Sequence, residues 1–261
     1  QVLMGTTDVV MDHQEKKELQ RKFINPELCD ITEALVYTEP YNDERGRNRV
    51  FPPIADFVKE KLYEDQGLHC EVAKLKMDFM TRAQSLIHGD LHTGSIFINE
   101  ESTKVFDPEF CFYGPMGYDI GNVIANMIFA WANGDAAGAA DFCKWVEDVL
   151  VDVINMTKEK MEKYYDEHVT DTMCRNELYK KYYMDTIIED TSAVAGLELI
   201  RRIVGMANVK DITTIADEAK RARAEKICIT AAIDFIKNRS DKKCGKCFLK
   251  TLKDAIAEVD A

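Results

Sequence analysis

The sequence predicts a mainly α fold, of the α+β class, with one small β-hairpin set among the helices. Most of the chain beyond residue 119 repeats apolar side chains at helical spacing. Only two short segments, Ile96 to Ile98 and Lys104 to Phe106, have the composition of strands, and Asn99 to Thr103 forms the turn between them. So small a sheet cannot organise the core of a chain of 261 residues, and helices must therefore do so.

Helices are also predicted before the hairpin, on both sides of a polar segment. Their apolar spacing and start signals place them at Asp12 to Phe23, Pro26 to Leu35, Ile54 to Asp65 and His69 to Ala83. Pro52 or Pro53 can open the third of these helices, because proline fits the first helical turn. The segment from Thr38 to Arg49 is polar and rich in turn-forming residues, which predicts an exposed loop.

The chain after the hairpin is expected to be almost entirely helical. Asp119 can cap a helix over Ile120 to Ala132, and Asn133-Gly134-Asp135 can end it. A bend is expected in a later helix, near Gly196 or Gly205. The remaining predicted helices cover Asp141 to Glu167, Asn176 to Val209, Ile215 to Lys237 and Phe248 to Val259.

The composition excludes several classes of protein. A formal net charge of −12 argues against general nucleic-acid binding, because phosphate backbones require a basic surface. No apolar segment reaches the roughly 20 residues of a membrane span, and the first residues lack the pattern of a secretory signal. The chain has no initiator methionine, so Gln1 is expected to be an internal residue of a longer protein.

The eight cysteines are scattered, which is typical of reduced thiols in a cytoplasmic protein. Cys244-Gly245-Lys246-Cys247 is the only CxxC sequence. A zinc site would require a second pair or nearby histidines, and the nearest histidine in sequence is His168. We therefore interpret this segment as a loop with two free thiols.

The strongest chemical signal is His88-Gly89-Asp90, which is followed seventeen residues after Asp90 by Asp107-Pro108-Glu109. An aspartate in a loop can accept the proton of a hydroxyl that attacks phosphorus. Gly89 leaves room for a close approach of backbone or ligand, and His88 is expected to support the loop through hydrogen bonds.

Asp107 and Glu109 are candidate ligands for Mg²⁺, which prefers carboxylate oxygens and keeps positions free for water and phosphate. Taken alone, Asp-Pro-Glu would be interpreted as a surface turn. The predicted hairpin, however, returns this segment to the neighbourhood of Asp90, and the combination favours a metal site.

Three further residues complete the candidate site. Asp119 is expected to accept N–H groups of the loop without touching a substrate. Arg201 and Arg202 point about 100° apart on a helix, so they cannot both lie idle on one solvated face. They either pair with Glu198 or Asp190, or face a polyhydroxy or phosphoryl ligand.

Together these residues resemble the small-molecule kinases related to aminoglycoside and choline kinases, and most specifically the 5-methylthioribose kinase family. The resemblance covers most of the chain. Ser95 departs from the wider superfamily, which has asparagine at this position. The motifs that carry the resemblance are His88 to Ser95, Asp107 to Phe110, Pro26 to Glu33, Tyr113-Gly114-Pro115 and Glu198 to Arg202.

The resemblance implies that residues 1–261 form a protein-kinase-like C-terminal helical lobe that binds substrate and metal, and that the nucleotide-binding N-terminal lobe is not in this chain. It implies phosphorylation of 5-methylthioribose to its 1-phosphate in methionine salvage, with ATP and Mg²⁺, by a cytoplasmic homodimer. Asp90 would be the base, and Arg201 and Arg202 would bind substrate together with it. Asp107 and Glu109 would hold the metal. His88, Ser95 and Asp119 would support the loop.

Two alternatives remain open at this point. The protein could be a related kinase of choline, an aminoglycoside or a homoserine-type alcohol. It could also be a truncated, non-catalytic binding protein with a kinase-like fold. Because no phosphate-binding loop precedes Asp90, we expect residues 1–261 alone to be inactive.

Overall fold

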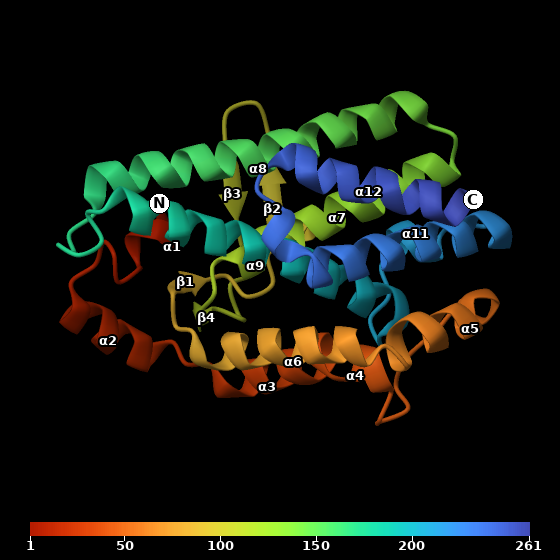
Figure 1. Ribbon diagram of the computed structural model, residues 1–261, viewed down its shortest axis with the longest axis horizontal. Coiled ribbons are helices and arrows are strands. Elements are labelled where there is room, and N and C mark those ends of the chain that lie inside the picture. The colour runs from red at the N-terminus through yellow and green to blue at the C-terminus, as the bar shows by residue number, and fades with distance from the viewer.

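Helices form the body of the structure. The computed structural model describes residues 1–261, and Figure 1 shows a layer of long helices that run along the longest axis of the molecule. These helices are α7 (Gly117–Ala136), α8 (Ala140–His168), α9 (Glu177–Val204), α11 (Glu218–Lys237) and α12 (Gly245–Asp260). The predicted mainly α fold is thereby confirmed.

The first third of the chain forms a second group of shorter helices. Its α3 and α6 lie side by side below the long helices in Figure 1, where α6 contacts α11 and α3 contacts α9. The third predicted helix is irregular, because 3₁₀, α and π turns follow one another. The elements are α1 (Val2–Gly5), α2 (His13–Lys22), α3 (Pro26–Tyr37), α4 (Glu39–Asn42), a 3₁₀ turn (Pro52–Ile54), α5 (Ala55–Val58), a π turn (Lys59–Tyr63) and α6 (Gln66–Thr81).

The prediction of an exposed loop from Thr38 to Arg49 is wrong at its beginning. Glu39, Pro40 and Tyr41 are buried in the short helix α4. The Glu39 carboxylate can be buried because Arg47 donates to it through both Nε, at 3.0 Å, and Nη2. Pairing with Arg47 offsets the cost of burying the Glu39 charge. The beginning of the polar segment can therefore pack against the protein.

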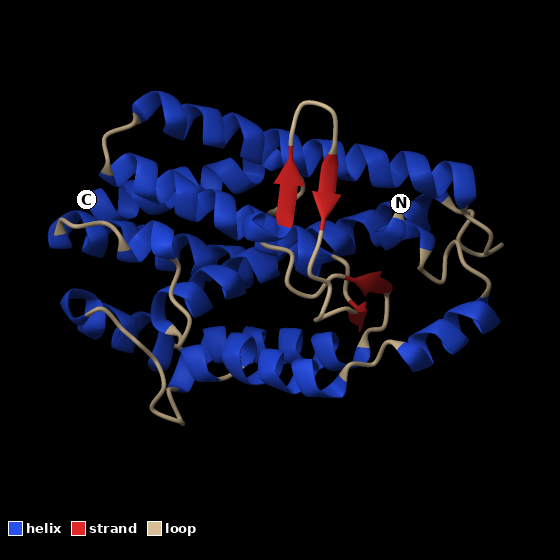
Figure 2. Ribbon diagram, turned by 180° about the vertical axis from the view of Figure 1, so that it is seen from behind, coloured by secondary structure: helices blue, strands red, loops and turns tan.

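Two small antiparallel sheets interrupt the helices (Figure 2). The predicted hairpin is present as β2 (Ile96–Ile98) and β3 (Thr103–Val105), with Phe97 opposite Lys104. A second sheet, which the sequence analysis missed, pairs β1 (Ser85–Ile87) with β4 (Phe112–Gly114). Each of its strands has only three residues, too few to show a periodic pattern.

Helix α9 lies at the centre of the fold. Every residue from Asp190 to Ile200 is buried, as expected for a helix that is covered on all sides. Gly196 does not interrupt it. The helix ends at Val204, five residues before the predicted end, because Gly205 adopts an extended conformation and the Asn208 amide bonds the carbonyl oxygen of Ile203.

Helices α7 and α9 approach each other closely where α7 presents two glycines. A Cβ atom on Gly117 would lie 2.5 Å from the Asp190 Cβ, and one on Gly121 would lie 2.7 Å from the Thr191 carbonyl oxygen. Both distances are below van der Waals contact. The absence of side chains at these positions sets the spacing between the two helices.

We expect Gly121→Ala to lower the free energy of unfolding by about 1–3 kcal/mol, because the added methyl group forces α7 away from α9. In an open helix the same change would stabilise the protein. Urea unfolding of Gly121→Ala and of a control variant, Gly67→Ala, compares their free energies of unfolding. The Cβ of that control would meet only the ends of the Asp65 and Lys237 side chains. A Gly121→Ala protein as stable as the control would contradict the close packing.

Candidate active site

The His88–Ser95 loop connects β1 to β2 and is held by helix α7. The Asp119 carboxylate accepts the backbone N–H of His88 at 2.7 Å and that of Gly89 at 2.9 Å. Burial raises the pKa of Asp119, while these two hydrogen bonds act in the opposite direction. Asp119 is not the helix cap that we predicted, because α7 already begins at Gly117 and the side chain bonds the loop and not its own helix.

His88 connects the loop to the end of the hairpin. Its Nε2 lies 2.9 Å from the carbonyl oxygen of Phe106, and its Nδ1 lies 3.3 Å from the backbone nitrogen of Asp90. These contacts require the proton to be on Nε2, so that Nε2 donates and Nδ1 accepts. The ring therefore bonds the backbone on both sides.

Gly89 allows the residue after the Asp-Pro-Glu segment to pack directly against the loop. Gly89 has a φ of +82°, and a side chain here would place its Cβ 2.3 Å from the Phe110 carbonyl oxygen. Phe106 and Phe110 thus both contact the loop and bracket Asp107 and Glu109. Because only three residues separate the two contacts, this acidic segment must lie beside His88 and Gly89.

Asp107 and Glu109 are both exposed within this segment. Asp107 has a φ of +64°, in the left-handed region that aspartate tolerates better than most residues. No group of three or more His, Cys, Asp or Glu side chains converges in the structure, so there is no closed metal cage. Two open carboxylates nevertheless fit Mg²⁺, which usually takes one or two carboxylates and completes its shell with water and substrate phosphate.

The Asp90 side chain extends from the loop toward the end of α9. Its Oδ1 is 3.3 Å from Nη2 of Arg201, and its Oδ2 is 3.8 Å from Nε2 of His92. Ser95 also turns toward Asp90, because its hydroxyl donates to the Asp90 carbonyl oxygen at 3.4 Å. The Asp90 side chain remains 28% exposed, so a small hydroxyl compound can reach it.

Arg201 and Arg202 share one buried carboxylate. Glu198 accepts from Nε of Arg202 at 2.9 Å and from both Nη2 (3.2 Å) and Nε of Arg201. Burial acts to raise the pKa of Glu198, but the two guanidinium groups outweigh it and lower that pKa below its ordinary value. Of the two carboxylates predicted as partners of these arginines, only Glu198 pairs with them. Asp190 pairs instead with Arg82.

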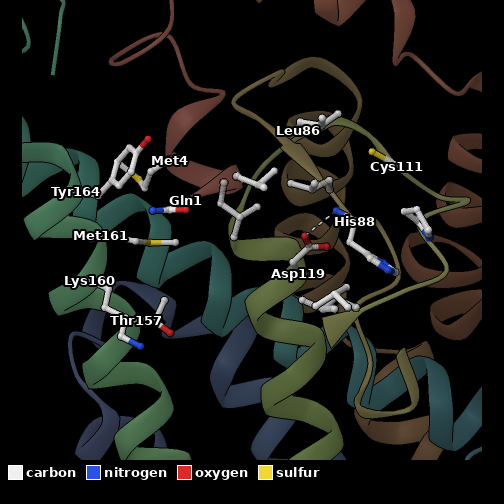
Figure 3. A pocket seen from close by; sticks show the side chains of 16 residues that line it. Gln1, Met4, Leu86, His88, Cys111, Asp119, Thr157, Lys160, Met161 and Tyr164 are labelled. Atoms are coloured by element: carbon white, nitrogen blue, oxygen red, sulfur yellow. Dashed lines mark hydrogen bonds between the residues drawn. The ribbon is translucent and has the colours of Figure 1, made fainter. Parts of the chain in front are cut away.

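An apolar cavity of about 740 Å³ opens beside the loop (Figure 3). His88 and Asp119 line one side of it, and the figure draws the hydrogen bond that the His88 backbone N–H donates to the Asp119 carboxylate. Met161 and Tyr164 of α8 contribute to the opposite side. A cavity of this size, lined mainly by apolar side chains, is suited to the apolar part of a small ligand.

Sequence reasoning missed two residues of this region and assigned one only as an alternative. Glu198 had a usable signal, since a glutamate three and four residues before two arginines can pair with both on a helix. No pattern in the sequence points to His92 or Tyr118. Tyr118 is buried between Phe79 and the Arg201 region, and burial raises its pKa well above the ordinary range.

The lowered pKa of Glu198 predicts a dependence of stability on pH. A carboxylate whose folded pKa is depressed stabilises the protein above its ordinary pKa of 4.5, and this contribution is lost as the pH falls through the folded value. We expect Glu198→Gln to cost about 3–5 kcal/mol at neutral pH, because it removes the carboxylate that pairs with Arg202 and one of the two that pair with Arg201. This cost should shrink on acidification.

Urea unfolding between about pH 7 and about pH 3 measures this dependence. The control is Glu18→Gln, which removes an exposed partner of Arg21 and should cost at most about 1 kcal/mol at any pH. A penalty for Glu198→Gln that did not change with pH would contradict the assignment.

Comparison with known proteins identifies relatives of this chain. The phosphotransferase enzyme family matches residues 22–150. The methylthioribose kinase of Bacillus pumilus (strain SAFR-032) is 36% identical over 235 residues, which are 90% of this chain and 58% of the relative. That of Escherichia coli O45:K1 (strain S88 / ExPEC) is 35% identical, over 91% of this chain and 60% of the relative.

A plant protein gives the same result: methylthioribose kinase 1 of Oryza sativa subsp. japonica is 37% identical over 87% of this chain and 56% of its own length. No helix in the structure combines the length and the apolar composition needed to cross a membrane. The predicted resemblance is confirmed: the chain is similar to the methylthioribose kinases and spans 56–60% of the length of these three relatives, and its residues 22–150 match the phosphotransferase enzyme family.

Proposed function

We propose that residues 1–261 form the substrate- and metal-binding lobe of an ATP-dependent kinase that phosphorylates 5-methylthioribose on its anomeric hydroxyl. One observation supports this most directly. The segment that contains Asp107 and Glu109 is bracketed by contacts with His88 and Gly89, next to Asp90 in the chain. The names of the relatives supply the substrate.

Asp90 acts as the base in this proposal. It accepts the proton of the sugar hydroxyl while the hydroxyl oxygen forms a bond to the γ-phosphorus, and the bond from that phosphorus to the β–γ bridging oxygen of ATP breaks. The adjacent Arg201, whose Nη2 lies 3.3 Å from Asp90 Oδ1, orients the Asp90 carboxylate. Orientation matters more than basicity in this reaction, because phosphoryl transfer depends mainly on position and charge.

The other residues supply charge and support. Asp107 and Glu109 hold Mg²⁺, which when bound neutralises the phosphate oxygens of the nucleotide. Arg201 and Arg202 bind the sugar and the transferred phosphoryl group, with Glu198 fixing both guanidinium groups. His88, Ser95 and Asp119 maintain the loop through the hydrogen bonds described above.

The relatives are longer than this chain, and we propose that a further nucleotide-binding lobe belongs to the active protein. The reaction would form part of methionine salvage and would take place in the cytoplasm, in a homodimer. Residues 1–261 alone are expected to have little or no activity with ATP.

We expect Asp90→Asn to reduce kcat by about 10²- to 10⁴-fold, because the amide cannot accept the hydroxyl proton, while affinity for methylthioribose changes little. The measurement is phosphotransfer from ATP to methylthioribose in the longest natural protein that contains this chain. Glu101→Gln, an exposed carboxylate in the turn of the same hairpin, serves as the control. A near-normal kcat in the Asp90 variant would exclude this residue as the base.

A substrate comparison in the same assay separates the remaining alternatives. A methylthioribose kinase should prefer the thio-sugar over choline, an aminoglycoside or homoserine. A preference for one of these amines would replace the proposed substrate. No turnover of any of them by the longest protein would favour a non-catalytic binding protein.

A further inference from the structure

Two thiols face each other at the beginning of α12. The sequence interpretation of Cys244 to Cys247 as a loop is wrong, because Cys244 is the N-cap of α12 and Cys247 lies in its first turn. The two sulfur atoms are 3.0 Å apart. This is the only hydrogen-bonded pair of thiols in the structure, although the chain has eight cysteines, all of them free.

The separation of the two sulfur atoms is not much longer than a disulfide bond. A disulfide bond is about 2.05 Å long, so the two sulfurs would need to approach by roughly 1 Å. Both cysteines are only partly buried, so a small thiol reagent can reach them.

The surrounding contacts hold this turn against the helical core. The Gly245 N–H donates to Oδ1 of Asn155 at 3.0 Å, and a Cβ on Gly245 would lie 2.4 Å from the Val151 carbonyl oxygen. Just before the turn, Lys242 pairs with Asp234 of α11, and Lys243 pairs with Glu189 of α9. Contacts with α8, α9 and α11 therefore fix the position of the turn that carries the two thiols.

The same surroundings favour a thiolate on Cys247. Partial burial acts to raise the pKa of Cys247, but the Cys244 thiol, the N–H groups of Lys243 and Cys244 and the Lys242 cation outweigh it and lower this pKa. A thiolate is the reactive form of cysteine in exchange with disulfides.

We propose that Cys244 and Cys247 form a redox-active dithiol site that exchanges with low-molecular-weight disulfides and closes reversibly to an intramolecular disulfide. The Cys247 thiolate attacks one sulfur of the small disulfide, which forms a mixed disulfide and releases one thiolate. Cys244 then loses its proton and attacks the Cys247 sulfur, which forms the Cys244–Cys247 bond and releases the second thiolate. The protein dithiol is oxidised, and the small disulfide is reduced to two thiols.

The test uses the 261-residue protein in glutathione buffers of increasing oxidation. Free thiols are alkylated, and intact and peptide mass spectrometry then count and locate them. We expect the wild-type protein to fall from eight free thiols to six, with the new disulfide between Cys244 and Cys247, and to recover all eight on addition of dithiothreitol. Cys70→Ser, at an exposed cysteine outside the pair, is the matched control and should form the same disulfide.

Single variants of the pair test the order of the steps. Cys244→Ser should stop at the mixed disulfide and carry one glutathione on Cys247. Cys247→Ser should react more slowly, because it lacks the thiolate that attacks first. The proposal is overturned if the wild-type protein becomes glutathionylated at Cys70 while Cys244 and Cys247 remain reduced. Glutathione retained on Cys247 of the wild-type protein, without closure, would overturn it as well.

Discussion

Glu198 lies in the most buried part of α9, and its carboxylate is shared by Arg201 and Arg202. An unpaired charge at such a position would be very unfavourable, and two adjacent arginines without a counter-charge would repel each other. The shared carboxylate solves both problems at once. Together with Asp90 it balances the two guanidinium charges, and it leaves Arg201 oriented toward Asp90, so the position of the acidic loop depends on a charge that never reaches the surface.

The loop itself is fixed from two further directions. Asp119 at the beginning of α7 accepts the N–H groups of His88 and Gly89, and α7 is in turn packed tightly on α9 through Gly117 and Gly121. The helix that holds the loop and the helix that carries the arginines therefore form one rigid unit. Functional groups are best positioned by such elements, because the supporting contacts leave little freedom for the side chains.

Much of this arrangement could be predicted from the sequence, and the failures have physical causes. The long helices and the β2–β3 hairpin follow from periodic apolar residues and a clear turn. Strands β1 and β4 could not be found, since Ser85–Ile87 and Phe112–Gly114 are short and distant in sequence. The burial of Glu39 depends on its pairing with Arg47, which no local pattern reveals. Similarly, the motif containing Asp90 is visible in the sequence, whereas its contact with Arg201 requires the folded protein.

That contact has a consequence for how the protein acquires its site. Asp90 and Arg201 are 111 positions apart in the chain, and the loop and the arginines meet only after α7 and α9 have docked. Contacts between such distant residues form after a large loss of chain entropy, and therefore late in folding. A partly folded chain could contain most of its helices and still lack the site. Ligand binding at Asp90 would thus report the docking of α7 and α9, which helical content alone cannot detect.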